Sequence, residues 1–147
     1  MLLISHRGNV IGPDKQKENT IGHIDSAISN GFLCEVDVWL IQDTLYLSHD
    51  QPIVSQKIDR SIFDDRKDYL VIHCKNLSAL TYFAQTDVHY FWHQTDDYTL
   101  TSKNWIWCYP GKTGSTSHPS ICVMPELTNQ SVISFTGVCS DYIERYK

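Results

Sequence analysis

Short apolar runs recur along the whole chain, and their length fits β-strands better than buried helices. Segments with helical periodicity or turn residues separate the first runs, whereas the later connections are short and poor in helical periodicity. Such alternation is typical of βαβ units, whose parallel strands are buried on both faces. We therefore expect an α/β fold with about seven to eight mostly parallel strands. The expected strands cover residues 2–5, 32–40, 45–47, 69–73, 88–92, 105–109, 121–124 and 137–140.

Three connections carry helix signals. Residues 21–30 place isoleucines and an alanine on one helical face, and a glycine follows them. A second helix is expected to begin at Asn76 or Ser78 and to continue through Ala84, and a shorter one is expected over 58–63. The early half of the chain is thus expected to keep helices that the late half lacks.

The size and charge of the chain narrow its class. A chain of 147 residues is expected to form one domain, residues 1–147. The net charge of −5 gives no basic surface for nucleic acid, and no apolar run approaches the length of a membrane span. The apolar start, residues 1–4, is too short for a signal peptide, so we expect a cytoplasmic protein. The five cysteines form no CxxC pair and are expected to be buried, reduced thiols.

Polar residues suited to phosphate chemistry follow several of the expected strands. In a (β/α) barrel the carboxyl ends of the strands meet at one rim, where catalytic groups gather. Four separate segments deliver such residues to this expected rim, and their convergence carries more weight than any single motif. The residues are His6, Arg7, Glu35, Asp37, His49, His73 and Lys75.

Glu35 and Asp37 are the candidate metal ligands in this set. Their spacing on a strand places both carboxylates on one side, which suits a hard cation such as Mg²⁺ or Ca²⁺. A solvated strand face or a pair of salt bridges would give the same pattern. Their apolar neighbours favour the metal site, because buried carboxylates need a partner.

His6 and His49 suit general acid–base catalysis near neutral pH. In phosphodiester cleavage, one histidine takes a proton from the nucleophile and the other protonates the leaving alkoxide. The Arg7 guanidinium would neutralise phosphoryl oxygens. Asp50, Asp37 or Glu18 would orient one of the imidazoles.

Five short motifs in the first fifty residues resemble the glycerophosphodiester phosphodiesterase family, in order and in spacing. Each motif alone is weak, but five in register are specific, and they cover about a third of the chain. Weaker similarity continues at His73-Cys74-Lys75 and over residues 137–142. The five motifs are His6-Arg7-Gly8, Glu18-Asn19-Thr20, Ala27 to Gly31, Glu35-Val36-Asp37-Val38 and His49-Asp50.

The resemblance implies a TIM barrel of the phospholipase-C-like phosphodiesterase superfamily and metal-dependent hydrolysis of a small glycerophosphodiester, in lipid metabolism. It makes Glu35 and Asp37 metal ligands, and it makes His6 and His49 the acid–base pair. By the same resemblance Arg7 contacts the phosphate, and Lys75 holds the phosphate or a metal-bound carboxylate.

The chain departs from this family where a third metal-binding glutamate is expected and His73 stands instead. An imidazole ligand brings no negative charge, so a borderline ion such as Mn²⁺ or Zn²⁺ becomes an alternative to Mg²⁺ or Ca²⁺. The other interpretations are that His73 only packs or forms hydrogen bonds, or that Glu126 is a distant substitute.

The chain is also short for a TIM barrel, which usually needs roughly 200 residues or more. We therefore expect a compact or incomplete TIM-type barrel, a markedly shortened family member with several helices shortened or lost. An uncovered outer face would favour a homo-oligomer. Trp39 and Trp92 are expected to form an aromatic wall at the barrel mouth that contacts the substrate, although tryptophans in strands more often belong to the core.

Two alternative functions stay open at this level. Sphingomyelinase-D-type phospholipases share the two-histidine, metal-bound barrel, and the substrate's own hydroxyl attacks to form a cyclic phosphate. A non-catalytic phosphoester-binding or assembly module would keep the barrel mouth without turnover, but such a module would need no acid–base histidines.

Overall fold

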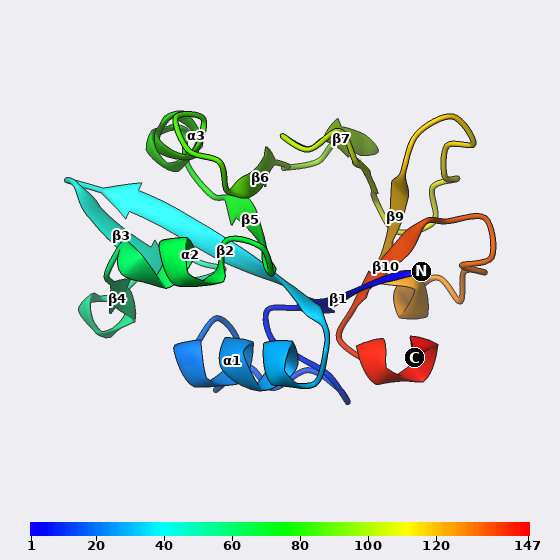
Figure 1. The fold of residues 1–147 in the computed structure, drawn as a ribbon, viewed down its shortest axis with the longest axis horizontal. Helices are drawn as coiled ribbons and strands as arrows, with labels where there is room; N and C mark the ends of the chain where they lie inside the picture. Colours follow the sequence, from blue (N-terminus) through cyan, green and yellow to red (C-terminus); the bar gives the residue numbers. More distant parts are fainter.

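The computed structural model describes all 147 residues as an α/β protein with one mixed, mostly parallel sheet of ten strands and three helices (Figure 1). The helices are α1 (Ile21–Ser29), α2 (Ser61–Arg66) and α3 (Leu77–Phe83). The strands are β1 (Leu2–His6), β2 (Leu33–Ile41), β3 (Thr44–Leu47), β4 (Lys57–Ile58), β5 (Leu70–Cys74), β6 (His89–Trp92), β7 (Tyr98–Leu100), β8 (Ile106–Cys108), β9 (Ser120–Val123) and β10 (Gly137–Ser140).

Seven strands run parallel in the order β6-β5-β2-β1-β10-β9-β8. Three antiparallel strands extend this set: β3 and β4 continue from the far end of β2, and β7 pairs with β8. The sheet curls so that β6 and β7 approach each other (Figure 1). No ladder joins these two strands, so the sheet is open and its strand pairing does not form a closed barrel.

The helices cover only part of the outer face of the sheet, behind β2, β5 and β6. Ile24 of α1, Phe63 of α2 and Phe83 of α3 are buried there against Val36 and Ile72 of the sheet. Asn76 begins α3 as a capping residue, since its side-chain oxygen accepts a hydrogen bond from the backbone N–H of Ala79.

The outer face of β8, β9 and β10 carries no α-helix and is covered by the chain's own irregular segments. Phe135 packs on Cys108 and Cys122, and Ile143 of a 3₁₀ turn packs on Val138. This face is therefore not the exposed apolar surface that the short length of the chain predicts. The expected homo-oligomer stays a prediction.

The inner face of the curled sheet has its own core. One side chain from each of six strands meets there, and all six are buried. They hold the two ends of the curled sheet together, because Phe91 of β6 lies 4.6 Å from Trp107 of β8 between ring centroids. The six residues are Ile4, Val71, Phe91, Trp107, Ile121 and Cys139.

Most expected elements are confirmed, including the helices at 21–30 and 76–84 and all eight strands. The short helix expected over 58–63 is wrong at its start, because Ile58 pairs with Leu45 in β4 and the helix begins at Ser61. Strands β4 and β7 were not expected, because two or three residues carry no readable alternation.

Two further predictions have structural outcomes. All five cysteines are buried and free, and burial raises the pKa of Cys34 to about 12. None of the helices has the length and apolar character needed to cross a membrane.

Candidate metal and phosphate site

A cavity of about 890 Å³ opens directly above the inner core, at the carboxyl ends of the parallel strands. Side chains two positions apart on a strand share a face, so the residue two places after each inner-core residue reaches this cavity. Six residues at such positions line it: His6, His73, His93, Tyr109, Val123 and Asp141. The alternation of side chains along each strand thus explains why these six residues form the floor of the cavity.

Glu35, Asp37 and His73 form a compact group of possible metal ligands on β2 and β5. One ligand atom from each lies within 4.8 Å of the others, and both carboxylates are buried. The pairing of the strands explains the cluster, because Asp37 and His73 are direct partners in the parallel ladder. The structure therefore brings together the three residues that the sequence predicts as ligands.

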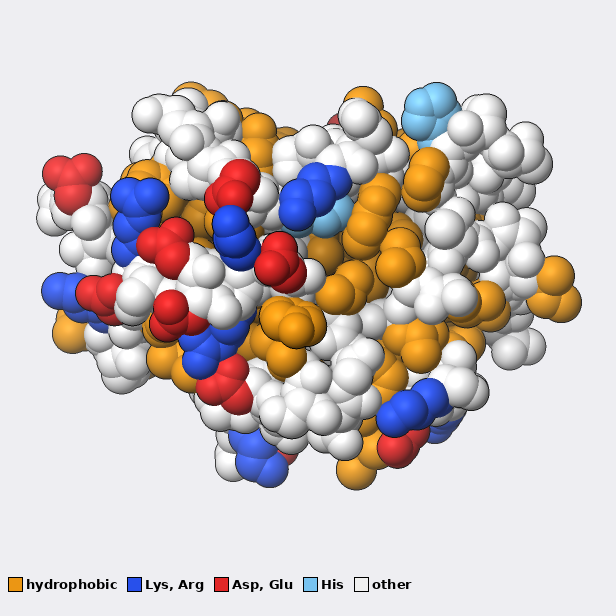
Figure 2. Space-filling model, viewed as in Figure 1, with side chains coloured by type: hydrophobic (Ala, Val, Ile, Leu, Met, Phe, Trp, Pro, Cys, Tyr) orange, Lys and Arg blue, Asp and Glu red, His pale blue; other side chains and the backbone are white.

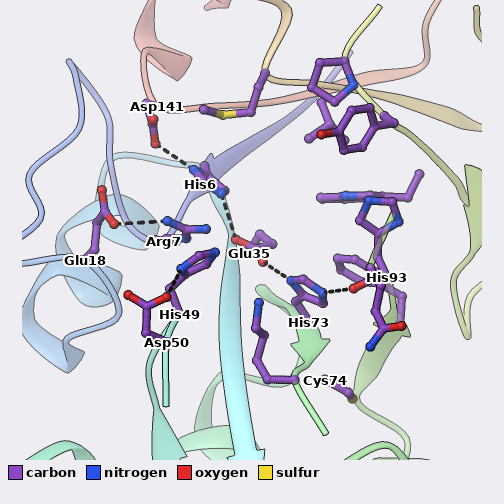
Figure 3. A pocket seen from close by; sticks show the side chains of 18 of the residues that line it. His6, Arg7, Glu18, Glu35, His49, Asp50, His73, Cys74, His93 and Asp141 are labelled. Carbon is purple, nitrogen blue, oxygen red and sulfur yellow. Dashed lines mark hydrogen bonds and ion pairs between the residues drawn. The ribbon is translucent and has the colours of Figure 1, made fainter. Parts of the chain in front are cut away.

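One ring nitrogen of His73 faces the carboxylate of Glu35 (Figure 3) and also that of Asp37. Its Nε2 lies 2.8 Å from the backbone oxygen of His93, which can only accept, so Nε2 carries a proton. Its ring stacks on Phe91 at 4.9 Å. The Nδ1 atom then faces Asp37 Oδ1 at 3.0 Å and Glu35 Oε1 at 3.7 Å.

Three electron-rich atoms facing one point need a positive charge between them. A bound cation would supply that charge. Glu35 Oε2 and Asp37 Oδ1 are both buried without a hydrogen-bond donor. Buried oxygens without a hydrogen-bond partner destabilise the folded protein. The ligand atoms of this group therefore fit a divalent cation, which would pair with these oxygens.

The two carboxylates differ in their pKa values. Burial, and next the charge of Asp37, raise the pKa of Glu35. Burial would also raise the pKa of Asp37, but the close His73 imidazole and the charges of Arg7 and Lys75 lower it overall. Asp37 is therefore the firmly ionised member of the group.

Arg7 and Lys75 both direct their charges at Asp37. Arg7 Nε lies 2.8 Å from Asp37 Oδ2, and Lys75 Nζ lies 3.6 Å from Asp37 Oδ1. Arg7 also pairs with Glu18 at 3.3 Å. Asn19 completes the surroundings, because its side chain donates to Asp37 Oδ2 and accepts from the Asp37 backbone N–H.

His6 stands at the end of β1, between Asp141 and Glu35 (Figure 3). Its Nδ1 lies 2.8 Å from Asp141 Oδ1, and its Nε2 lies 3.9 Å from Glu35 Oε2. Burial lowers the pKa of His6, but the hydrogen bond with Asp141 and the charge of Glu35 raise it overall.

His49 lies on the loop after β3 and lines the same cavity as His6. Its side chain is 48% exposed, and its Nδ1 lies 3.0 Å from Asp50 Oδ1, as the sequence suggested for an orienting carboxylate. Burial, and next the charge of Arg7, lower the pKa of His49. The pKa values of the two candidate acid–base histidines are therefore shifted in opposite directions: the pKa of His6 is raised and that of His49 is lowered.

Both tryptophans of the expected aromatic wall border the cavity. The Trp39 indole is fixed beside the His49 loop, because its Nε1 donates to the backbone oxygen of Ser48. Trp92 also packs against the core beneath the helices. The ring that stacks on His73 belongs to its neighbour Phe91, which alternation turns to the inner face.

Sequence reasoning missed the partner of His6. Asp141 follows β10, more than 130 residues away, and the motif pattern marked its segment only as a weak similarity. Asn9 donates to both Asp141 and Glu18 and so links the two ends of the chain. Glu126 does not line the cavity: it accepts from Ser140 and from the backbone of Asp141.

Comparisons of this chain with models of protein families, with curated proteins and with solved structures give no match. The resemblance of the motifs to a phosphodiesterase family therefore stays an expectation. The case for a function rests on those motifs and on the geometry of the cavity.

Proposed function

We propose that this protein is a metal-dependent phosphodiester hydrolase that acts on glycerophosphodiesters or related diesters. The observation that carries the proposal is the convergence of Glu35, Asp37 and His73 on one point, with two buried oxygens that lack a donor. His6 and His49, together with the positively charged side chains of Arg7 and Lys75, border the same cavity. This is the inventory that phosphoryl transfer needs.

Glu35, Asp37 and His73 would hold the divalent cation. The two carboxylates favour Mg²⁺ or Ca²⁺, and the imidazole makes Mn²⁺ or Zn²⁺ an alternative. When bound, the metal would neutralise charge on the phosphoryl oxygens as a Lewis acid. It would also supply the missing partner of the buried oxygens.

His6 and His49 would move the protons of the reaction. Asp141 holds His6 by its Nδ1, so the Nε2 atom is the one directed toward Glu35 and the cavity. Water adds to phosphorus and loses a proton to one histidine, while the other protonates the departing alkoxide. The products are a phosphomonoester and an alcohol, so atoms and charges balance.

Arg7 and Lys75 would bind the phosphate. Both lie against Asp37, and both line the cavity. A cation held by the carboxylates would compete for Asp37 and leave these two side chains to contact the phosphoryl oxygens. Because Arg7 and Lys75 already lie beside the candidate ligands, they would need little rearrangement when the substrate binds.

We also propose that the curled sheet is a reduced TIM-type barrel. Six strands send side chains into one inner core, and the site lies at their carboxyl ends, as in that fold. The backbone N–H of Ser102 lies 2.9 Å from the oxygen of Tyr90, a contact across the gap between β6 and β7.

The test is turnover by purified protein, followed by phosphorus NMR with glycerophosphodiesters and a series of divalent ions. We expect EDTA-sensitive formation of a monoester, and a loss of about 10²- to 10⁴-fold in kcat for His6→Ala and for His49→Ala. His118→Ala, which changes an exposed histidine outside the cavity, is the control.

The outcomes separate the alternatives. A cyclic phosphate product would indicate attack by a substrate hydroxyl instead of water. Binding without turnover for every metal would indicate a non-catalytic module. Full activity in both histidine variants would refute the proposed mechanism.

A further inference from the structure

The cavity has two chemically different walls. The segments through β6 contribute almost all of its charged side chains, including Glu35, Arg7 and Lys75. The segments after β7 contribute only one charged residue, Asp141. Their remaining lining residues are apolar or aromatic: Trp107, Tyr109, Pro110, Val123, Met124 and Leu127.

The apolar wall is accessible to a ligand and is not merely core. Tyr109 is 46% exposed and Leu127 is 67% exposed, and both line the cavity. Trp107 and Val123 lie deeper and continue the wall down to the inner core. Large apolar side chains left open to water around a cavity favour an apolar ligand, because binding removes their surface from water.

The size of the cavity agrees with a ligand larger than glycerol phosphate. Its volume of about 890 Å³ lies toward the upper end of pockets that take drug-sized molecules. The charged wall accounts for the phosphate. The opposite wall offers few polar groups that could bind the hydroxyls of a second glycerol.

Resting on the proposed function, we propose that the substrate is a phosphodiester with one apolar alcohol group, and that this group lies against Tyr109 and Leu127. The apolar wall and the proposed phosphate site belong to one continuous cavity. A group that contacts the wall would therefore be part of the same substrate molecule. An alkyl chain and an aryl ring share the required chemistry, and the two are separated by the choice of substrates.

The experiment compares three glycerol phosphodiesters that differ only in the second ester: methyl, octyl and benzyl. We expect kcat/KM to rise by roughly fourfold for each methylene that the wall buries. The octyl ester should therefore exceed the methyl ester by at least about tenfold. A preference for benzyl over octyl would indicate an aryl substrate, and the reverse would indicate an alkyl chain.

Leu127→Ala and Tyr109→Ala should reduce the ratio of octyl to methyl kcat/KM severalfold. Ile133→Ala is the matched control, because Ile133 is 91% exposed in the same half of the molecule but does not line the cavity. Equal kcat/KM for methyl and octyl esters, or an unchanged ratio in both wall variants, would overturn the inference and leave hydrolysis intact.

A binding measurement tests the inference if no ester is hydrolysed. Methylphosphonate and octylphosphonate are titrated calorimetrically, with and without Mn²⁺. Tighter binding of octylphosphonate to the unmodified protein than to Leu127→Ala would support the apolar wall even where the proposed function fails. Equal binding of the two phosphonates under both conditions would refute it.

Discussion

The two halves of this molecule use the same parallel sheet in different ways. Behind β2, β5 and β6, connections with helices cover the outer face, and side chains such as Phe63 and Phe83 fill the space beneath them. From β7 to β10, irregular segments and 3₁₀ turns do this with single residues such as Phe135 and Ile143. Figure 2 shows charged side chains gathered mainly over the helix-covered half. A short chain can thus omit the helices on one side of the sheet and still bury that side with irregular segments.

The same division runs through the cavity. The helix-covered half supplies the candidate ligands Glu35 and His73 and the basic side chains of Arg7 and Lys75. The other half supplies an apolar wall with Asp141 as its single charge. The difference teaches that the proposed chemistry and the proposed recognition of the substrate lie on largely separate parts of the fold. The predictions below test this division, beginning with the residue that crosses it.

Asp141→Asn should have the largest effect, because it removes the charge that orients His6 from the opposite half. We expect kcat to fall by about 10³-fold, as when the orienting carboxylate of a catalytic histidine is replaced. Asp141 also raises the pKa of His6, so the limb of the pH profile that reports His6 should move to lower pH.

The matched control is Glu144→Gln, an exposed acidic residue three positions further along the chain. A pH profile identical to that of the unmodified protein in Asp141→Asn would show that His6 does not depend on this pair. Loss of activity with an unchanged profile would assign Asp141 to folding alone.

Trp107→Ala should cost about 3–5 kcal/mol of unfolding free energy, as for other buried aromatic residues. Trp107 is 4% exposed and contacts Phe91, so it joins the two halves. Phe83→Ala, within the helix-covered half, should cost a similar amount. Denaturant titration should give one transition for both variants, whereas two separate transitions in Trp107→Ala would mean that the halves fold independently.

His89, at the junction of the halves, should make the stability of the protein depend on pH. It lies on β6, and its Nε2 is 2.7 Å from Thr101 Oγ1 beyond β7. Burial, and next the charge of Lys103, lower its pKa to about 4. The unfolded chain, with a histidine pKa near ~6.5, binds the proton more readily, so stability falls as the pH drops from ~6.5 toward ~4.

The expected loss from His89 is about 2 kcal/mol between pH 7 and pH 5. His89→Gln should remove this contribution, and the difference in slope between the two proteins is read from denaturant titrations at several pH values. The same slope in both proteins would show that His89 is not the group that titrates.

Asp25→Asn should have the smallest effect. Asp25 of α1 pairs with Arg66 of α2 at 2.6 and 2.9 Å, but the Asp25 side chain is 47% exposed. Solvent-exposed ion pairs of this kind contribute about 0.5 kcal/mol. A melting-temperature shift of only a few degrees would agree with this, and a large loss would mean that the helix-covered half depends on its surface charges.

The sequence predicted the parts of the fold that follow from local pattern. The alternation of β2 placed Glu35 and Asp37 on one face, and Asn76 marked the start of α3. The candidate ligands came together because they follow neighbouring parallel strands.

The rest depends on tertiary contacts that local pattern does not encode. The partner of His6 lies at the other end of the chain, and the orientation of His73 is set by the backbone of His93. Sequence length suggested a bare outer face, but loop residues such as Phe135 cover it. The very short strand β4 exists because the β2–β3 hairpin provides an edge for it.

The central claim is that Glu35, Asp37 and His73 hold a divalent cation. The most direct test is calorimetric titration of Mn²⁺ into the unmodified protein and into Glu35→Gln, which keeps the shape of the side chain and removes its charge. We predict one site per chain in the unmodified protein and binding at least about tenfold weaker in the variant. Equal affinity in the two proteins, or no binding of any divalent ion to the unmodified protein, would contradict the claim.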